Sequence, residues 1–208
     1  NCDNDVIYDP VSNELWVYYV WEQDAQNYGQ IGTSNFKPSI LRRIRVAATQ
    51  GGSGFTYAVQ KDAGQGNPYT DLVTSTYHYD MQSPAVVRRD ANTWLMWSNN
   101  SDQGVAPTGW NNQNGFVELR RSNNGKDWDA PQSLQTTFVL KGETKDYIPW
   151  HLDVQWIPNV GADGSGEYWA LICAYPKGGG SNHTDLFFAK SADGELWTTY
   201  PNPILSPR

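Results

Sequence analysis

Carboxylates and a histidine recur at the starts of three segments that we expect to be the first strands of repeated units. The segments align on three valines, at positions 6, 86 and 154. The position before each valine is held by Asp5, Ala85 and Asp153, and the position two residues earlier by Asp3, Ser83 and His151. Because side chains two residues apart share one face of a strand, these groups are expected to line one mouth of the fold.

Two carboxylates held close together have the properties of an acid–base pair. Repulsion between like charges raises the pKa of one member, which can stay protonated as an acid while its neighbour acts as a base. Asp5 and Asp153 are therefore candidate catalytic residues, with Asp3 beside them. The alternative is that aspartates at exposed strand ends only bond to turns and keep those ends solvated.

Aromatic and polar residues gather in the segments around the same strand starts. Such residues suit a sugar, because an aromatic ring can cover the apolar face of the sugar while polar tips bond to its hydroxyls. The candidate substrate-binding residues are Tyr77, His78, Trp110, Trp150 and His151. The alternative is that these rings belong to the core, which is the commoner place for tryptophan.

A seven-residue motif marks the turns that must position these strands. Residues 191–197 read Ser-Ala-Asp-Gly-Glu-Leu-Trp, and residues 122–128 keep the serine, glycine and tryptophan with Asn124 in place of the aspartate. A degenerate copy at residues 49–55 keeps only Thr49, Gly52 and Phe55. Each copy follows an extended run, so each is predicted to be a turn between two strands, with the glycine supplying left-handed backbone angles.

The three copies start about 70 residues apart, and a fixed period of this size indicates a stacked or radial repeat. We expect an all-β fold, a β-propeller in which about three four-stranded blades occupy roughly residues 3–75, 80–140 and 150–208 of a single domain spanning 1–208. Propellers usually have about four to eight blades. The chain is therefore expected to be incomplete, with further blades supplied by a longer chain or a partner chain. A β-sandwich is the alternative, but it needs no fixed repeat.

Composition and charge narrow the possible partners. Ten Trp, twelve Tyr, nineteen Gly and twelve Pro suit many short strands joined by turns. The net charge is −7 and the Lys and Arg residues are scattered, which argues against nucleic acid and against an anionic membrane surface. No segment approaches the roughly 18 apolar residues that a membrane span needs, so membrane insertion is not expected. A neutral polar partner, a carbohydrate, is favoured.

Several segments resemble the five-bladed propellers of glycoside hydrolase families 43 and 32 and their phage-associated relatives. They are residues 83–87 followed by 93–97, the motif at 191–197, and residues 150–154 with 186–191. The resemblance spans almost the whole chain and implies that carboxylates at the starts of inner strands act as base, pKa modulator and acid. Asp3 or Asp5 matches the base position. Ser83 stands where the family has its second carboxylate, and Asp80 lies just before it, while no glutamate starts an inner strand.

These features predict a glycan-active protein, a glycoside hydrolase if it is catalytic, located outside the cell or on a virion surface. The alternative is a non-catalytic carbohydrate-binding or adhesion module of a phage tail or a cell surface. No cofactor is expected. A Ca²⁺ ion in the channel stays open as an option, because Asp3, Asp5 and Asp153 offer hard oxygen ligands.

Overall fold

Three antiparallel sheets form the chain in the computed structural model, which describes residues 4–22, 39–74, 81–100, 115–134, 137–142, 145–178 and 183–206. The first sheet contains β1 (Asn4–Asp9), β2 (Glu14–Glu22), β3 (Ser39–Gly51), β4 (Gly54–Gln60) and β5 (Thr70–Thr74). The second contains β6 (Gln82–Asp90), β7 (Thr93–Asn100), β8 (Phe116–Ser122) and β9 (Gln132–Ser133). The third contains β10 (Tyr147–Ile157), β11 (Glu167–Pro176), β12 (Asp185–Ser191) and β13 (Thr198–Thr199).

Each sheet is a meander in which consecutive strands pair antiparallel, so the prediction of an all-β chain built from four-stranded units is confirmed. The first sheet differs by one strand. From the sequence we expected residues 61–82 to be a long loop, but β5 lies within that segment and pairs with the start of β3, on the same edge as β4. Among the described residues there is no helix, and hence none that is long and apolar enough to cross a membrane.

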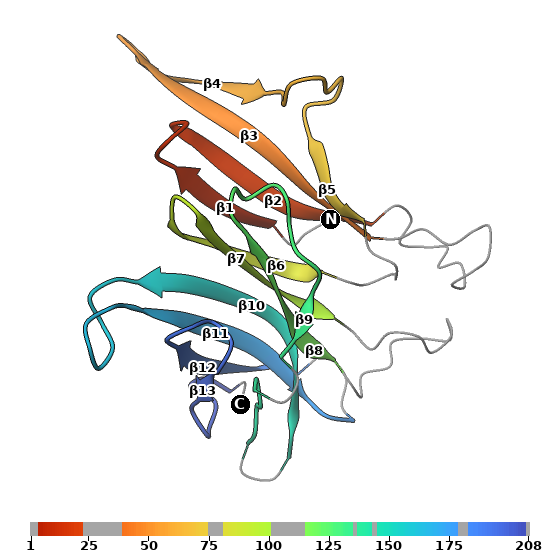
Figure 1. Cartoon of the computed structure of the whole chain (residues 1–208). Coiled ribbons are helices and arrows are strands. Elements are labelled where there is room, and N and C mark those ends of the chain that lie inside the picture. Colours follow the sequence, from red (N-terminus) through yellow and green to blue (C-terminus); the bar gives the residue numbers. More distant parts are fainter. Residues whose placement is uncertain are drawn as a thin grey trace, which may run out of the picture.

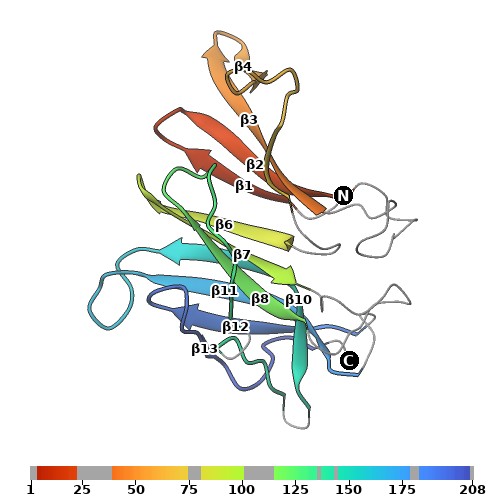
Figure 2. The same cartoon turned by 45° about the vertical axis from the view of Figure 1, so that its right-hand side comes forward.

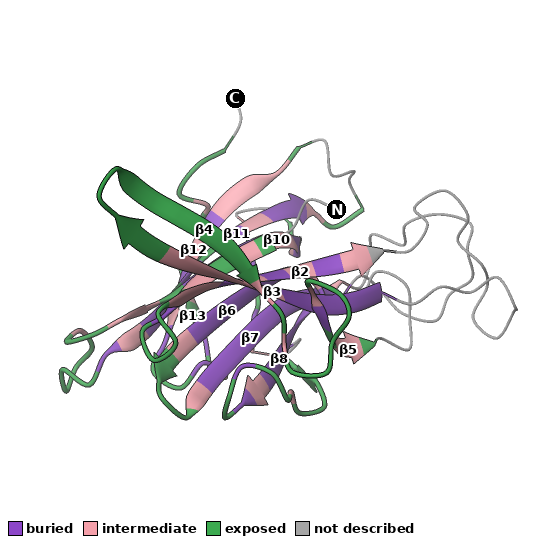
Figure 3. Ribbon diagram, turned by 90° about the horizontal axis from the view of Figure 1, so that it is seen from above, coloured by how far each residue is buried: buried purple, intermediate pink, exposed green. Residues whose placement is uncertain are grey.

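The sheets pack face to face, with β1, β6 and β10 as neighbouring first strands (Figures 1 and 2). One core lies between the first and second sheets and includes Trp16, Tyr18, Trp94 and Met96. A second, larger core lies between the second and third sheets and includes Trp97, Tyr168 and Trp197. The second sheet is covered on both faces, and its strands are largely buried, whereas β4 is exposed (Figure 3).

The turns that follow β8 and β12 have the same construction, as the repeated motif predicts. In the turn after β12, the Asp193 carboxylate accepts the N–H groups of Glu195 and Leu196 at 2.8 and 2.9 Å, and the Ser191 hydroxyl accepts the N–H of Gly194 at 2.8 Å. In the turn after β8, Asn124 accepts two N–H groups at 2.8 and 2.9 Å in the same way. The prediction that the two turns are equivalent is confirmed.

The motif tryptophans pack beneath their turns, as expected. Trp197 is 8% exposed and Trp128 is half-buried against the core between the first two sheets. The degenerate copy is different, because β3 and β4 stay paired up to Gly51 and Gly54 and Phe55 is 58% exposed. Without an aspartate or asparagine to bond to the turn amides, that segment forms an extended hairpin.

Both motif turns also join one sheet to the next. The Tyr18 hydroxyl in the first sheet donates to the carbonyl oxygen of Gly125 in the second at 2.8 Å. Trp97 in the second sheet donates its indole N–H to the carbonyl oxygen of Gly194 in the third at 2.9 Å. Gly125 and Gly194 have φ values of 66° and 81°, and a Cβ on Gly194 would lie 2.8 Å from the Trp97 ring. Glycine is required at these turns by backbone conformation and by the closeness of the neighbouring sheet.

Replacing Gly194 should therefore destabilise the protein by more than the unfavourable backbone conformation alone would. We expect Gly194→Ala to lower the free energy of unfolding by about 2–4 kcal/mol, because the left-handed angles disfavour alanine and the methyl group overlaps Trp97. Gly164→Ala is the matched control, since Gly164 has a φ of 71° with no neighbouring atom within 4 Å of the added Cβ, and it should cost about 1–2 kcal/mol. Equal losses in urea denaturation would contradict the role of Gly194 in joining the sheets.

Stability at acid pH should depend on Asp193. Burial alone would raise the pKa of its carboxyl, but the bonds from Leu196, Glu195 and Ser191 together outweigh it and lower the pKa. A lowered pKa in the folded state means that the stabilisation is present above the ordinary value of 3.8 and is lost as the pH falls through the folded-state pKa. Asp193→Asn, which copies Asn124, should be less stable than wild type at neutral pH and should approach it below that range. A difference in melting temperature that stays constant with pH would contradict this.

Candidate functional site

The first strands of the second and third sheets are both irregular near their starts. In β6 the pairing with β7 shifts between Gln82 and Ala85, and in β10 the pairing with β11 shifts between Pro149 and His151. β-bulges of this kind bend a strand and re-aim its side chains, and they are common beside functional sites. Here the two irregularities bring residues of the two sheets into contact.

Ser83 and His151 meet between these irregular segments. The Ser83 Oγ lies 2.5 Å from the His151 Nδ1, a hydrogen bond that joins the second and third sheets. Ser83 is buried and has a φ of 48°, and nearby Met81 has a φ of 60°. Left-handed angles at residues other than glycine cost energy and occur preferentially at functional sites. The contact marks a site at the starts of β6 and β10.

Trp150 lies beside this pair. Its ring meets the His151 ring edge to face, with centroids 5.1 Å apart, and meets Tyr175 in the same manner at 5.9 Å. The carbonyl oxygen of Trp150 accepts a hydrogen bond from the side-chain amide of Asn99, at the end of β7. The second sheet therefore holds the backbone of the irregular segment as well as its histidine.

Asp5 ties the first sheet to the second. Its carboxylate accepts the backbone N–H of Val86 in β6 at 2.5 Å and its neighbour Val6 N–H at 2.8 Å. Burial raises the pKa of Asp5 above its usual range, the two backbone bonds oppose that rise, and the negative charge of Asp153 adds to it. At the other end of β1, Asp9 forms an ion pair with Arg88 of β6 at 3.2 Å. Asp5 thus has a clear structural role.

The charge of Asp153 is the smallest of the influences on the pKa of Asp5, and the convergence of the two side chains stays a prediction. Asp153 itself is exposed on β10, where the Gln155 amide donates to it at 3.2 Å. Their assignment as catalytic residues stays a prediction. The other candidates, Asp3, Asp80, Tyr77, His78 and Trp110, lie outside the described residues.

Sequence reasoning placed Ser83 at the correct position but gave it no role. The sequence placed Ser83 in the same strand position as His151 and at the place of an expected carboxylate, whereas the structure makes it the partner of His151. Asn99 was missed altogether, since an asparagine at the end of a strand carries no signal until the neighbouring sheet is placed. The shared position of Ser83 and His151 in the strand alignment was the available clue.

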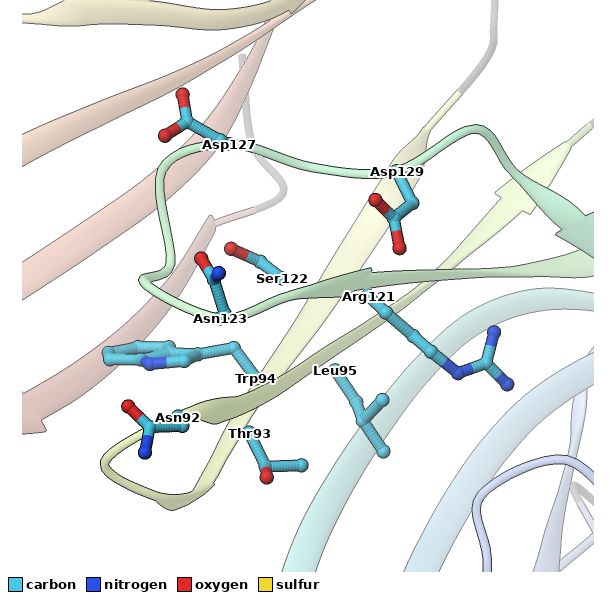
Figure 4. Close-up of a pocket in the computed structure, with 9 residues that line it drawn as sticks. All are labelled: Asn92, Thr93, Trp94, Leu95, Arg121, Ser122, Asn123, Asp127 and Asp129. Atoms are coloured by element: carbon cyan, nitrogen blue, oxygen red, sulfur yellow. The ribbon is translucent and has the colours of Figure 1, made fainter.

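A cavity of about 400 Å³ lies at the opposite end of the second sheet, away from all of these residues (Figure 4). It lies between the β6–β7 turn, which contains Asn92, and the motif turn after β8. Its side chains already have structural partners: Ser122 bonds to the motif turn, Arg121 bonds to Gln132 and Glu195, and Trp94 stacks on Trp16. We therefore place the candidate site at the strand starts.

No three His, Cys, Asp or Glu side chains converge as a metal site within the described ranges. A Ca²⁺ ion in the channel stays a prediction, because Asp3, one of its three expected ligands, lies outside those ranges. What the described site offers is an imidazole that can transfer a proton and an aromatic ring beside it, with Asp5 and Asp153 on the first strands β1 and β10 that flank β6. This set suits recognition and hydrolysis of a sugar derivative.

Comparison with known proteins gives a carbohydrate-active relative. The chain is 26% identical, over 223 aligned positions and all of its own length, to the A type blood N-acetyl-alpha-D-galactosamine deacetylase of Flavonifractor plautii. Its structure matches the crystal structure of an N-acetylgalactosamine deacetylase from F. plautii in complex with blood group B trisaccharide, with a TM-score of 0.73 and 25% identity over the whole chain. The chain matches no protein-family model.

These likenesses refine the expected family. They support the prediction of a carbohydrate-active protein, but the relative is a deacetylase and not a glycoside hydrolase. The chain spans 27% of the length of the curated relative and 54% of the chain in the solved structure. What the relative does as a whole protein is therefore considered for this chain only as a proposal.

The structural role of Asp5 can be tested by stability. Asn in place of Asp5 has one acceptor oxygen for two backbone N–H groups, so Asp5→Asn should lower the free energy of unfolding by about 1–3 kcal/mol. Asp153→Asn removes the same charge from an exposed side chain and should change it by less than about 0.5 kcal/mol. Denaturant titration of both variants at neutral pH is the measurement, and equal effects would show that Asp5 is not a tie between the sheets.

Proposed function

We propose that this chain carries the glycan site of an enzyme that removes the acetyl group from an N-acetylated amino sugar, of the N-acetylgalactosamine type. The observation that carries the proposal is the likeness to the F. plautii deacetylase, which extends over the whole chain in sequence and in structure. It is supported by the Ser83–His151 contact at the strand starts.

The reaction that the site would catalyse is hydrolysis of an amide. The reaction needs a group that accepts a proton from the attacking water and a group that returns a proton to the departing amine. A histidine can do both near neutral pH, because its ordinary pKa lies close to 6.5. We assign proton transfer to His151 and sugar stacking to Trp150, whose ring lies next to the imidazole.

We also propose that the three sheets are blades of a β-propeller, of about five blades, with β1, β6 and β10 around its axis. The support is the repeated joint between neighbouring sheets, in which an aromatic side chain donates to a glycine carbonyl of the next turn. The outer face of the third sheet exposes Trp169 and Leu171, at 37% and 43%. In the strand register, Trp169 and Leu171 of β11 occupy the positions that Leu95 and Trp97 hold in β7. Leu95 and Trp97 are covered by the third sheet, so a further sheet would cover Trp169 and Leu171 in the same way.

Glycoside hydrolysis is the second candidate. It is favoured by one observation, the position of Asp5 on β1 and Asp153 on β10, the two first strands that flank β6, since glycosidases use a pair of carboxyl groups. The two backbone bonds that Asp5 accepts count against it, because a carboxylate engaged in this way is less available to a substrate. A binding module without catalysis, acting outside the cell or on a virion, is the remaining proposal.

One assay separates these functions. The protein is incubated with oligosaccharides that end in N-acetylgalactosamine, and the products are analysed for free acetate and by mass spectrometry. We expect release of acetate and loss of one acetyl group with the sugar chain intact. Shortened saccharides would support the glycosidase instead, and binding without any product would support the binding module.

The role of His151 can be tested with one variant at this residue and a matched control variant at another histidine. His151→Ala should lower acetate release by about 100-fold or more, which is the contribution of a general acid–base group. His183→Ala, which removes the other described histidine, from an exposed position, should leave the rate within about 2-fold. Full activity of His151→Ala would refute the assignment of proton transfer to this residue.

A further inference from the structure

We infer that Ser83 is a positioning residue that fixes the orientation of the His151 imidazole. The inference rests on the proposed function, in which His151 transfers a proton. It is carried by three observations at the starts of β6 and β10: the Ser83–His151 bond, the left-handed backbone at Ser83, and the contacts that hold Trp150.

The bond itself places the hydroxyl on one particular ring nitrogen. Ser83 Oγ lies 2.5 Å from Nδ1 of His151, and the two residues come from different sheets, 68 positions apart in the chain. Either partner can be the donor, because a hydroxyl both donates and accepts, so the bond fixes the direction in which Nδ1 points whichever nitrogen carries the proton. A buried hydroxyl at this point therefore holds the imidazole in one orientation, and with it the direction in which Nε2 points.

The backbone indicates that the hydroxyl is the reason for a serine here. Ser83 has a φ of 48°, within the left-handed region that favours glycine. A glycine would adopt these angles with less strain, yet the chain has a side chain at this position, and that side chain is aimed at His151. Strain of this kind persists where the surrounding structure over-determines it, commonly at functional sites.

The second sheet also holds the segment that carries the histidine. The side-chain amide of Asn99 donates to the carbonyl oxygen of Trp150, the residue at the irregularity of β10. The Trp150 ring then meets the imidazole edge to face at 74°. The hydroxyl, the indole ring and the anchored backbone restrict the imidazole from separate directions, so removing the hydroxyl should change the ring without unfolding the strand.

The test uses a substitution that suits the backbone. Ser83→Gly removes the hydroxyl and relaxes the left-handed angles, so the relief of backbone strain should offset part of the loss of the hydrogen bond and the variant should stay folded. Asn13→Gly is the matched control, because Asn13 has a φ of 56° in the exposed β1–β2 turn and receives the same backbone change far from the site.

We expect Ser83→Gly to lower kcat for acetate release by about 10- to 100-fold with little change in KM, the usual effect of losing a group that orients a functional histidine. Nitrogen NMR of the labelled imidazole should show a shifted Nδ1 signal for His151, because that nitrogen loses its hydrogen-bond partner, and an unchanged spectrum for His183. In a His151→Ala background, Ser83→Gly should have no further effect on the residual rate, because the two residues act together.

Three outcomes would overturn the inference. They are an unchanged imidazole spectrum of His151 in Ser83→Gly, a kcat within about 2-fold of wild type in an active enzyme, or an acetyl group trapped on Ser83, which would make it a nucleophile. If wild type releases no acetate, the proposed function fails. The NMR comparison then still decides whether Ser83 fixes the ring, since it needs no turnover.

Discussion

The structure depends on one recurring contact, in which an aromatic side chain of one sheet donates a hydrogen bond to a glycine carbonyl in a turn of the next. Tyr18 does this to Gly125, and Trp97 does it to Gly194. The contact works only if the turn approaches closely, which demands glycine, and only if the turn is rigid, which the Asn124 or Asp193 side chain ensures by bonding to its amides. Core packing, sheet order and the alignment of the first strands follow from it.

Alignment of the first strands is what creates the candidate site. With β1, β6 and β10 fixed as neighbours, polar groups from different sheets meet near the strand starts, helped by small irregularities in β6 and β10. Asp5 reaches the backbone of β6, and Ser83 reaches His151 of β10. The contacts between sheets described above lie at the motif turns, and the candidate site lies at the opposite end of the same sheets. Stability and function can therefore be altered separately.

Under the proposed function, which rests on the likeness to an N-acetylgalactosamine deacetylase, this arrangement would hydrolyse an amide. Paired aspartates suggested glycoside cleavage, for which two carboxyls are needed. Amide hydrolysis instead places the emphasis on proton transfer by a well-oriented imidazole. The structure is consistent with that emphasis, because Asp5 is engaged by backbone amides while His151 is held by a serine, an indole ring and an anchored segment.

The sequence by itself determined most of the strands, the repeat and the two matching motif turns, because these depend on local chemistry: alternating apolar residues, a left-handed glycine and a side chain that bonds to its own turn. It missed β5, whose pairing with β3 is a contact between distant segments. It also placed polar residues at the strand starts. Only the tertiary structure decided what they do. The pairing of Ser83 with His151, the anchoring of Trp150 by Asn99 and the capture of Asp5 by Val86 all join different sheets. Such contacts depend on the relative position of the sheets and on local shifts in strand register, which no pattern within a single strand records.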